Sequence, residues 1–190
     1  MGFGCLAALA GLLAGAFSMA AGEWVSVRSQ REMYEYQIEL ERKELDEYPE
    51  EEVAELAVIY SARGMAKEDA RAMAQRVLSD PVKGLDVLSR EELGLNPEDL
   101  GSPWGAALFS FLSFSAGAMV PLLPFLLSSG GVALGISVGT TACALFCVGA
   151  MISLYTGRSA LRDGLRMLLI GAAAGGVTYG IGNLLGVAMV

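Results

Sequence analysis

Long stretches of this chain carry no charged side chain. None occurs before Glu23, between Leu100 and Gly157, or from Met167 to Val190. A helix needs about 20 apolar residues to cross a hydrocarbon core that is about 30 Å thick. The sequence therefore predicts an all-α polytopic membrane protein with four spans, at residues 1–22, 104–127, 132–155 and 167–190.

The charged residues are concentrated in one block, between Arg28 and Asp99, which gives the chain its net charge of -8. We expect three parts: a membrane helix at residues 1–27, an acidic cytoplasmic helical domain at 28–99, and three membrane helices at 100–190. An acidic surface of this kind repels nucleic acid and attracts cations, so we expect no nucleic-acid partner.

The lysines and arginines predict the orientation, because they concentrate on the cytoplasmic side of a membrane. Ten lie between Arg28 and Arg90, and the other three are Arg158, Arg162 and Arg166, between the third and fourth apolar runs. Both regions are therefore predicted to face the cytoplasm. The uncharged turn at 128–130 then faces outside, as do both termini.

An external N-terminus leads us to expect one more membrane helix upstream. The alternative is that residues 1–21 are a signal peptide, because small residues at 18–21 suit cleavage. The start of the chain lacks the basic region that such a peptide carries, and cleavage would export the acidic domain.

The acidic block is predicted to be a helical bundle. Residues 23–47 contain no Pro or Gly, so the first membrane helix should run straight on to Glu47 and be stopped by Pro49. Further helices are expected at 50–63, after Met65 to residue 78, and at 82–93, with Gly64 and Gly94 at two of the C-termini.

Four glutamates in this block are spaced for metal binding. Glu41 and Glu44 are three residues apart and share a helix face, and Glu52 and Glu55 repeat that spacing after Pro49. If the two helices form a hairpin, the four carboxylates converge, as hard divalent cations require. The chain has no His, which excludes histidine-based zinc or iron sites. The alternative is a solvated acidic face, the commoner meaning of a charge run.

The predicted membrane helices offer few candidate ligands. Met19 lies four residues before Glu23, so a thioether and a carboxylate share a helix face, although packing alone also accounts for a methionine there. Cys143 and Cys147 have the same spacing, which suits either a soft metal or small apolar packing. With Cys5 they make an odd count, which is no disulfide framework.

Proline and glycine shape the same helices. Pro121 and Pro124 break helix hydrogen bonds at membrane depth, which either lines a pathway or only shapes a kink. Small-residue stripes predict close helix contacts and dimerisation, and they comprise Gly131, Gly135 and Gly139, the pair Gly11 and Gly15, and the pair Gly171 and Gly175.

Three motifs, in order along the chain, resemble the vacuolar iron transporter family in its bacterial branch. They are SMAAGEWVSVRSQRE at 18–32, EELGL at 91–95 and GAMVPLLP at 117–124, and the similarity covers essentially all 190 residues. The resemblance implies a homodimer with five membrane helices per chain. It also implies transport of iron(II), often with manganese(II), out of the cytosol against protons, with a helical metal-binding domain between the second and third helices.

Carried over residue by residue, the resemblance makes Met19 a pore methionine. Five glutamates match the cytoplasmic metal site: Glu41, Glu44, Glu52, Glu55 and Glu92. The chain departs from the family in three places. Leu88 stands where the family has a methionine ligand, Gly11 stands where relatives can have a pore glutamate, and the first helix with its pore aspartate has no counterpart here.

We therefore expect a transporter that binds iron(II) at the acidic domain and passes it beside Met19 and Glu23 in exchange for protons. Manganese(II) and zinc(II) are further candidate ions, and no resident cofactor is expected. Binding should weaken as the pH falls toward carboxylate pKa values of about 4. Transport is expected to need the missing helix, so that the chain alone moves little iron.

The expected setting is a homodimer in a bacterial inner membrane with the metal-binding domain in the cytoplasm. An enzyme is not expected, because no nucleophile and base are paired in the sequence. The alternative is a non-transporting membrane protein, or a fragment, whose acidic domain buffers metal or docks a basic partner. The missing first helix favours that alternative.

Overall fold

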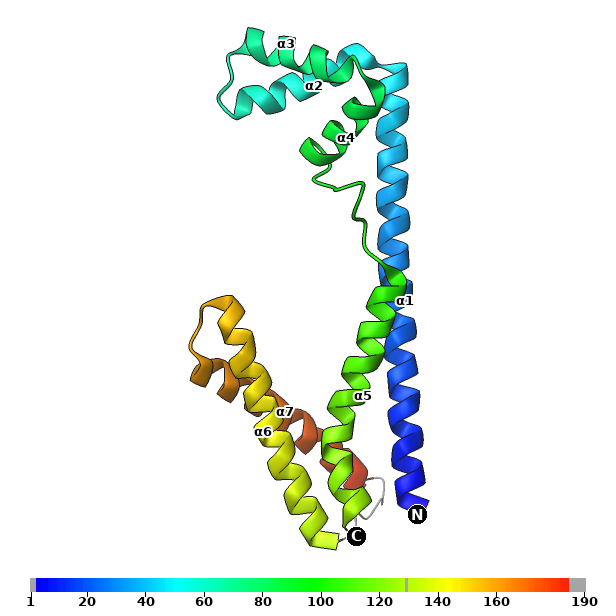
Figure 1. Cartoon of the computed structure of the whole chain (residues 1–190), viewed down its shortest axis with the longest axis vertical. Coiled ribbons are helices and arrows are strands. Elements are labelled where there is room, and N and C mark those ends of the chain that lie inside the picture. Colours follow the sequence, from blue (N-terminus) through cyan, green and yellow to red (C-terminus); the bar gives the residue numbers. More distant parts are fainter. Residues whose placement is uncertain (1–2, 129, 185–190) are drawn as a thin grey trace. The chain divides into compact units, whose positions relative to one another are not determined.

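The computed structural model describes residues 3–128 and 130–184, with side chains from residue 6 onward, and the regular secondary structure in this part of the chain is all helical (Figure 1). The all-α prediction is therefore confirmed for the described residues. The seven helices are α1 (Phe3–Glu47), α2 (Pro49–Ala62), α3 (Lys67–Leu78), α4 (Pro81–Glu91), α5 (Pro103–Leu127), α6 (Gly130–Thr156) and α7 (Ala160–Leu184).

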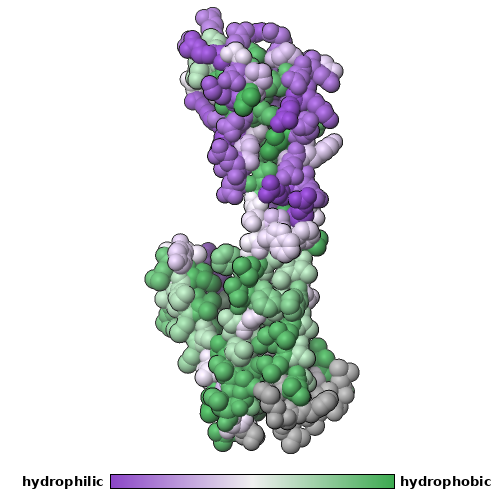
Figure 2. All heavy atoms as spheres, turned by 45° about the vertical axis from the view of Figure 1, so that its right-hand side comes forward, coloured by the Kyte–Doolittle hydropathy of each residue, from purple (hydrophilic) through white to green (hydrophobic). Residues whose placement is uncertain are grey.

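The chain divides into two compact units. The apolar unit comprises residues 1–19 and 110–190, and the acidic unit comprises Ala20–Phe109. Hydrophilic residues gather on the acidic unit and hydrophobic residues on the apolar unit (Figure 2). This division follows the distribution of charge along the sequence.

Four of the described helices, α1, α5, α6 and α7, are long and apolar enough to cross a membrane. The protein is thus an integral membrane protein. Helix α1 has 45 residues, whereas a span needs only about 20. The apolar first half of α1 satisfies that length, and the charged half continues beyond it without a break, as the sequence predicts.

The helix boundaries differ slightly from those predicted. Pro49 is the first residue of α2 rather than only the end of α1, because the first turn of a helix needs no N–H from that position. Gly64 and Gly94 have φ angles of +98° and +67°, which confirms their place at helix ends. A larger correction concerns α7, which begins at Ala160, so that Arg162 and Arg166 lie in the helix and not in a connecting loop.

A small apolar core holds the acidic unit together. Leu45 of α1 packs with Val53 and Leu56 of α2, Ala74 of α3 and Leu88 of α4. Leu56, Ala74 and Leu88 are completely buried. The core therefore draws one residue or more from each of the four helices and fixes the end of α1 against α2 and α4.

Close backbone contact joins α6 and α7 in the apolar unit. A Cβ atom added at Gly149 would lie 2.5 Å from the carbonyl oxygen of Asp163, and one added at Gly164 would lie 2.6 Å from the Phe146 ring. Only glycine permits this approach. Asp163 is buried as a result, with an exposed fraction of 6%.

The predicted glycine stripes are only partly confirmed. Gly15 lies against the Phe114 ring and Gly171 against Leu145. The other stripe members have no atom within 4 Å of an added Cβ among the described residues and so make no close helix contact there: Gly11, Gly131, Gly135, Gly139 and Gly175.

The remaining intramembrane candidates are placed as follows. Cys143 and Cys147 are free and exposed on α6, and the side chain of Cys5 lies outside the described residues. Helix α5 continues through Pro121 and Pro124. The Ser137 hydroxyl donates a hydrogen bond of 2.8 Å to the Pro121 carbonyl, which links α6 to α5 at this point.

Candidate metal centre

Three carboxylates meet where α1 ends and α2 begins. One oxygen from each of Glu41, Glu44 and Glu52 can be chosen so that all three atoms lie within 4.8 Å of one another. Glu41 and Glu52 are buried, with exposed fractions of 3% and 5%, and Glu44 is half-buried. The structure brings together these three of the four carboxylates predicted to converge, although α2 runs across the end of α1 rather than back along it as a hairpin would (Figure 1).

Local structure explains why they converge. Glu41, Glu44 and Leu45 lie on one face of α1, and Leu45 belongs to the apolar core. Only Tyr48 separates α1 from α2, and Glu52 lies in the first turn of α2 next to the core residue Val53. The apolar core thus holds the two helix ends together and places the acidic side chains at its edge.

Burial and mutual repulsion make Glu41 an unusual acid. Removal from water disfavours its charged form, and the negative charges of Glu92, Glu52 and Glu44 add to that effect. Together they raise the pKa of the Glu41 carboxyl from 4.5 to about 8. The metal-free site therefore holds a proton at neutral pH.

Glu52 and Glu92 show the same trend. Burial, and then the negative charge of Glu92, raises the pKa of Glu52. Burial, followed by the charge of Glu55, raises the pKa of Glu92. The negative charges of Glu44 and Glu55 contribute to these raised pKa values, so all five predicted glutamates take part in one electrostatic cluster. Glu55 and Glu92 lie on its exposed side.

The expected pH dependence must be corrected on this basis. Ordinary carboxylates would lose metal near pH 4. At a carboxylate with a pKa of about 8, protons already compete with the metal ion for the oxygen atoms near neutral pH. The sequence could not show this, because the shift arises from burial and from neighbours brought together by the fold.

The cluster offers the right atoms to a hard cation. Glu41 Oε1 and Glu52 Oε2 are buried and have no hydrogen-bond partner within the described structure, an arrangement that costs free energy unless something binds there. Iron(II) and manganese(II) accept carboxylate oxygens, and such an ion would satisfy both atoms and offset the repulsion. The donor set therefore fits a divalent cation.

The other predicted ligands are not members of this group of carboxylates. Met19 and Glu23 are both exposed on α1. Leu88, one turn before Glu92, is fully buried in the apolar core. The centre is thus built of oxygen atoms, with no sulfur from position 88.

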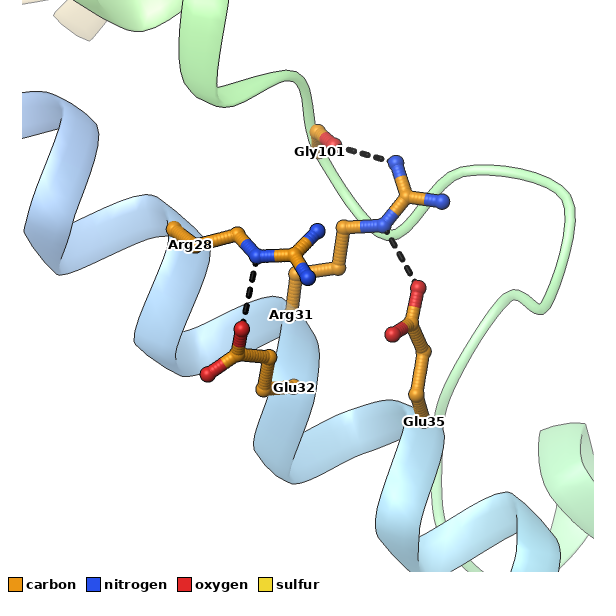
Figure 3. A network of polar contacts seen from close by, with 5 residues as sticks. All are labelled: Arg28, Arg31, Glu32, Glu35 and Gly101. Atoms are coloured by element: carbon orange, nitrogen blue, oxygen red, sulfur yellow. Dashed lines mark hydrogen bonds and ion pairs between the residues drawn. The ribbon is translucent and has the colours of Figure 1, made fainter.

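A brace between α1 and the segment before α5 was missed from the sequence. Arg31 donates hydrogen bonds to Glu35 at 2.7 Å and to the Gly101 carbonyl at 3.4 Å, and Arg28 pairs with Glu32 at 2.7 Å (Figure 3). The rings of Trp24 and Trp104 meet edge to face at 5.9 Å. Both tryptophans border apolar runs, as is typical of tryptophan at membrane interfaces. That position in the sequence could have indicated this contact.

The fold and the site together define a class: an integral membrane protein whose helical acidic unit carries a buried carboxylate site suited to divalent cations. Comparison with known proteins specifies it further. A model of the VIT family matches residues 4–183. The chain belongs to this family, which comprises membrane iron transporters rather than enzymes.

Named relatives are similar in sequence to nearly the whole of this chain. A vacuolar iron transporter of Acanthamoeba castellanii is 35% identical over 184 residues, which cover 94% of this chain and 68% of that protein. Vacuolar iron transporter 1 of Oryza sativa is 32% identical and covers 92% and 70%. Vacuolar iron transporter 1 of Arabidopsis thaliana is 30% identical and covers 91% and 70%.

Proposed function

We propose that this protein moves iron(II), and also manganese(II), across a membrane and out of the cytosol, with protons moving the opposite way. The observation that carries the proposal is the buried, mutually repelling cluster of Glu41, Glu44 and Glu52. The choice of iron as the transported ion rests on the names of the relatives, which are iron transporters.

The cluster supports proton coupling by simple competition. Its metal-free form holds at least one proton at neutral pH, because the pKa of Glu41 is about 8. A divalent ion that binds must displace that proton, and a proton that returns must weaken the hold on the ion. Uptake of metal and release of protons are therefore linked at one site, in the unit that we place in the cytoplasm.

Within the membrane we propose that Met19 and Glu23 contact the passing ion. Met19 has an exposed fraction of 50%, so half of its side-chain surface is left uncovered by the rest of the described chain. A soft sulfur favours late transition metals over calcium and magnesium. Because exposed glycine faces are typical of helix interfaces, we also propose that the working unit is a homodimer.

Metal binding tests the first part of this proposal. The full chain in neutral detergent should bind manganese(II) at pH 7, and a variant with Glu41, Glu44, Glu52 and Glu55 all changed to Gln should lose that binding. A variant with Glu51→Gln, exposed and next to the cluster, is the matched control. Unchanged affinity in the fourfold variant would show that these residues are only a solvated acidic face and do not bind the metal.

Flux tests the second part. Iron(II) entry into proteoliposomes is measured for the parent chain and for its variants. Met19→Ala should reduce the flux strongly, whereas Met33→Ala, with an exposed fraction of 51%, should not. Binding without flux in every version would show a metal-buffering protein instead.

A further inference from the structure

The three arginines outside the acidic unit line one cavity. A cavity of about 380 Å³ lies at the start of α7, and its walls are Arg158, Ser159, Arg162, Asp163 and Arg166. Three arginines and one aspartate give these walls a formal charge of +2. The cluster plays no part in the carboxylate site.

The guanidinium groups are available to a ligand. Among the described residues, no carboxylate forms an ion pair with Arg158, Arg162 or Arg166, although Asp163 lies in the same cavity wall. The backbone contact with Gly149 buries Asp163 and fixes the first turn of α7. The cavity thus has one wall packed against α6 and three arginines without an ion-pair partner among the described residues.

Its chemistry suits a phosphate group. Guanidinium groups bind phosphate oxygens through paired hydrogen bonds. The N-terminus of α7, which begins at Ala160, adds the positive end of a helix dipole. The Ser159 hydroxyl supplies a further donor at the wall.

The surface beside the cavity is apolar. Leu161 and Leu165 have exposed fractions of 62% and 47%, and each precedes an arginine of the cavity by one residue along α7. Leu154 and Tyr155, at the end of α6, are 79% and 92% exposed. A phosphate-binding cavity that borders exposed apolar side chains in a membrane protein matches a lipid better than a free ion.

We propose that this cavity binds the phosphate of an anionic phospholipid head group, with the acyl chains against the neighbouring leucines. Binding would anchor the start of α7 at the membrane surface. The site is independent of the metal centre, so this proposal and the proposed transport can fail separately.

The experiment titrates the full chain, in neutral detergent, with a fluorescent phosphatidylglycerol. Since each basic residue near a membrane contributes about 1 kcal/mol to anionic lipid binding, changing Arg158, Arg162 and Arg166 to Gln should weaken binding at least about tenfold. A second variant with all three changed to Lys keeps the charge and the fold but loses the paired geometry, and it should bind with intermediate affinity.

The matched control changes three exposed basic residues of the acidic unit, Lys43, Lys67 and Arg76, to Gln, and it should bind as the parent does. Phosphatidylcholine with the same acyl chains should bind at least about tenfold more weakly than phosphatidylglycerol, since it carries no net charge. Equal binding of the two lipids, or unchanged binding in the arginine-to-glutamine variant, would overturn the proposal. Saturable binding of inorganic phosphate without lipid binding would replace it with a free-phosphate site.

Discussion

Replacing Glu41 with Gln should have opposite effects on the metal-free and metal-bound protein. In the metal-free chain the carboxyl has a pKa of about 8, against 4.5 in the unfolded chain. Folding stability tied to this group is therefore fully present below pH 4.5 and is lost as the pH rises toward 8, because the unfolded chain ionises first. A glutamine at position 41 has nearly the same shape and cannot ionise, so the variant does not lose this stability as the pH rises.

The size of the gain follows from the pKa difference. pH 7 lies about 2.5 units above the pKa of this carboxyl in the unfolded chain. At 1.36 kcal/mol per unit, the upper limit for the gain in folding stability is about 3 kcal/mol. Protons shared with Glu52 and Glu92 reduce the amount, so we expect about 1–2 kcal/mol. In a chain of this length that corresponds to a rise of about 3–6 °C in Tm.

The assay is thermal unfolding of the full chain in detergent with chelator, at pH 5 and pH 7, repeated with excess manganese(II). Glu41→Gln should raise Tm at pH 7 and barely change it at pH 5. It should also remove most of the stabilisation by manganese(II), because a ligand is lost. The neighbouring Glu51→Gln should change neither. Destabilisation of the metal-free variant at pH 7 would refute the argument from buried repulsion.

Two further substitutions test the surroundings of the site and the apolar unit. Leu88→Met conserves volume and should cost less than about 1.5 kcal/mol, while the added thioether should shift competition binding toward zinc(II) over manganese(II); an unchanged preference would show that position 88 does not reach the ion. Gly149→Ala drives a methyl group into the backbone of α7, 2.5 Å from the Asp163 oxygen, and should cost about 1–3 kcal/mol in thermal unfolding. Gly139→Ala, with open space around it, should cost nothing, and equal losses in both variants would contradict the described packing of α6 on α7.

Patterns along the chain predict the helices well, because uncharged runs and the period of apolar residues are properties of local sequence. The continuity of α1 through Glu47 follows from the absence of Pro and Gly at residues 23–47. The start of α7 was misplaced because Arg162 and Arg166 resemble a charged loop, although arginine is a good helix former.

The meeting of three carboxylates was predictable from the sequence, but their raised pKa values were not. The spacing of Glu41, Glu44 and Glu52 indicates a shared volume, and the structure confirms it. The raised pKa values of Glu41 and Glu52 depend on burial beside Leu45 and Val53, which only the packing of the end of α1 on α2 produces. Likewise, the small-residue pattern could not distinguish Gly149 and Gly164, which contact α7 and Phe146, from the open glycines of α6.

Counting the protons released when manganese(II) binds tests the central claim most directly. Calorimetric titrations of the full chain at pH 7, in buffers with different ionisation enthalpies, give this number. With a Glu41 pKa of about 8, the account predicts release of about one proton or more per ion from the parent chain, and clearly fewer from the Glu41→Gln variant. Binding with no proton release, or with equal release from both proteins, would contradict it.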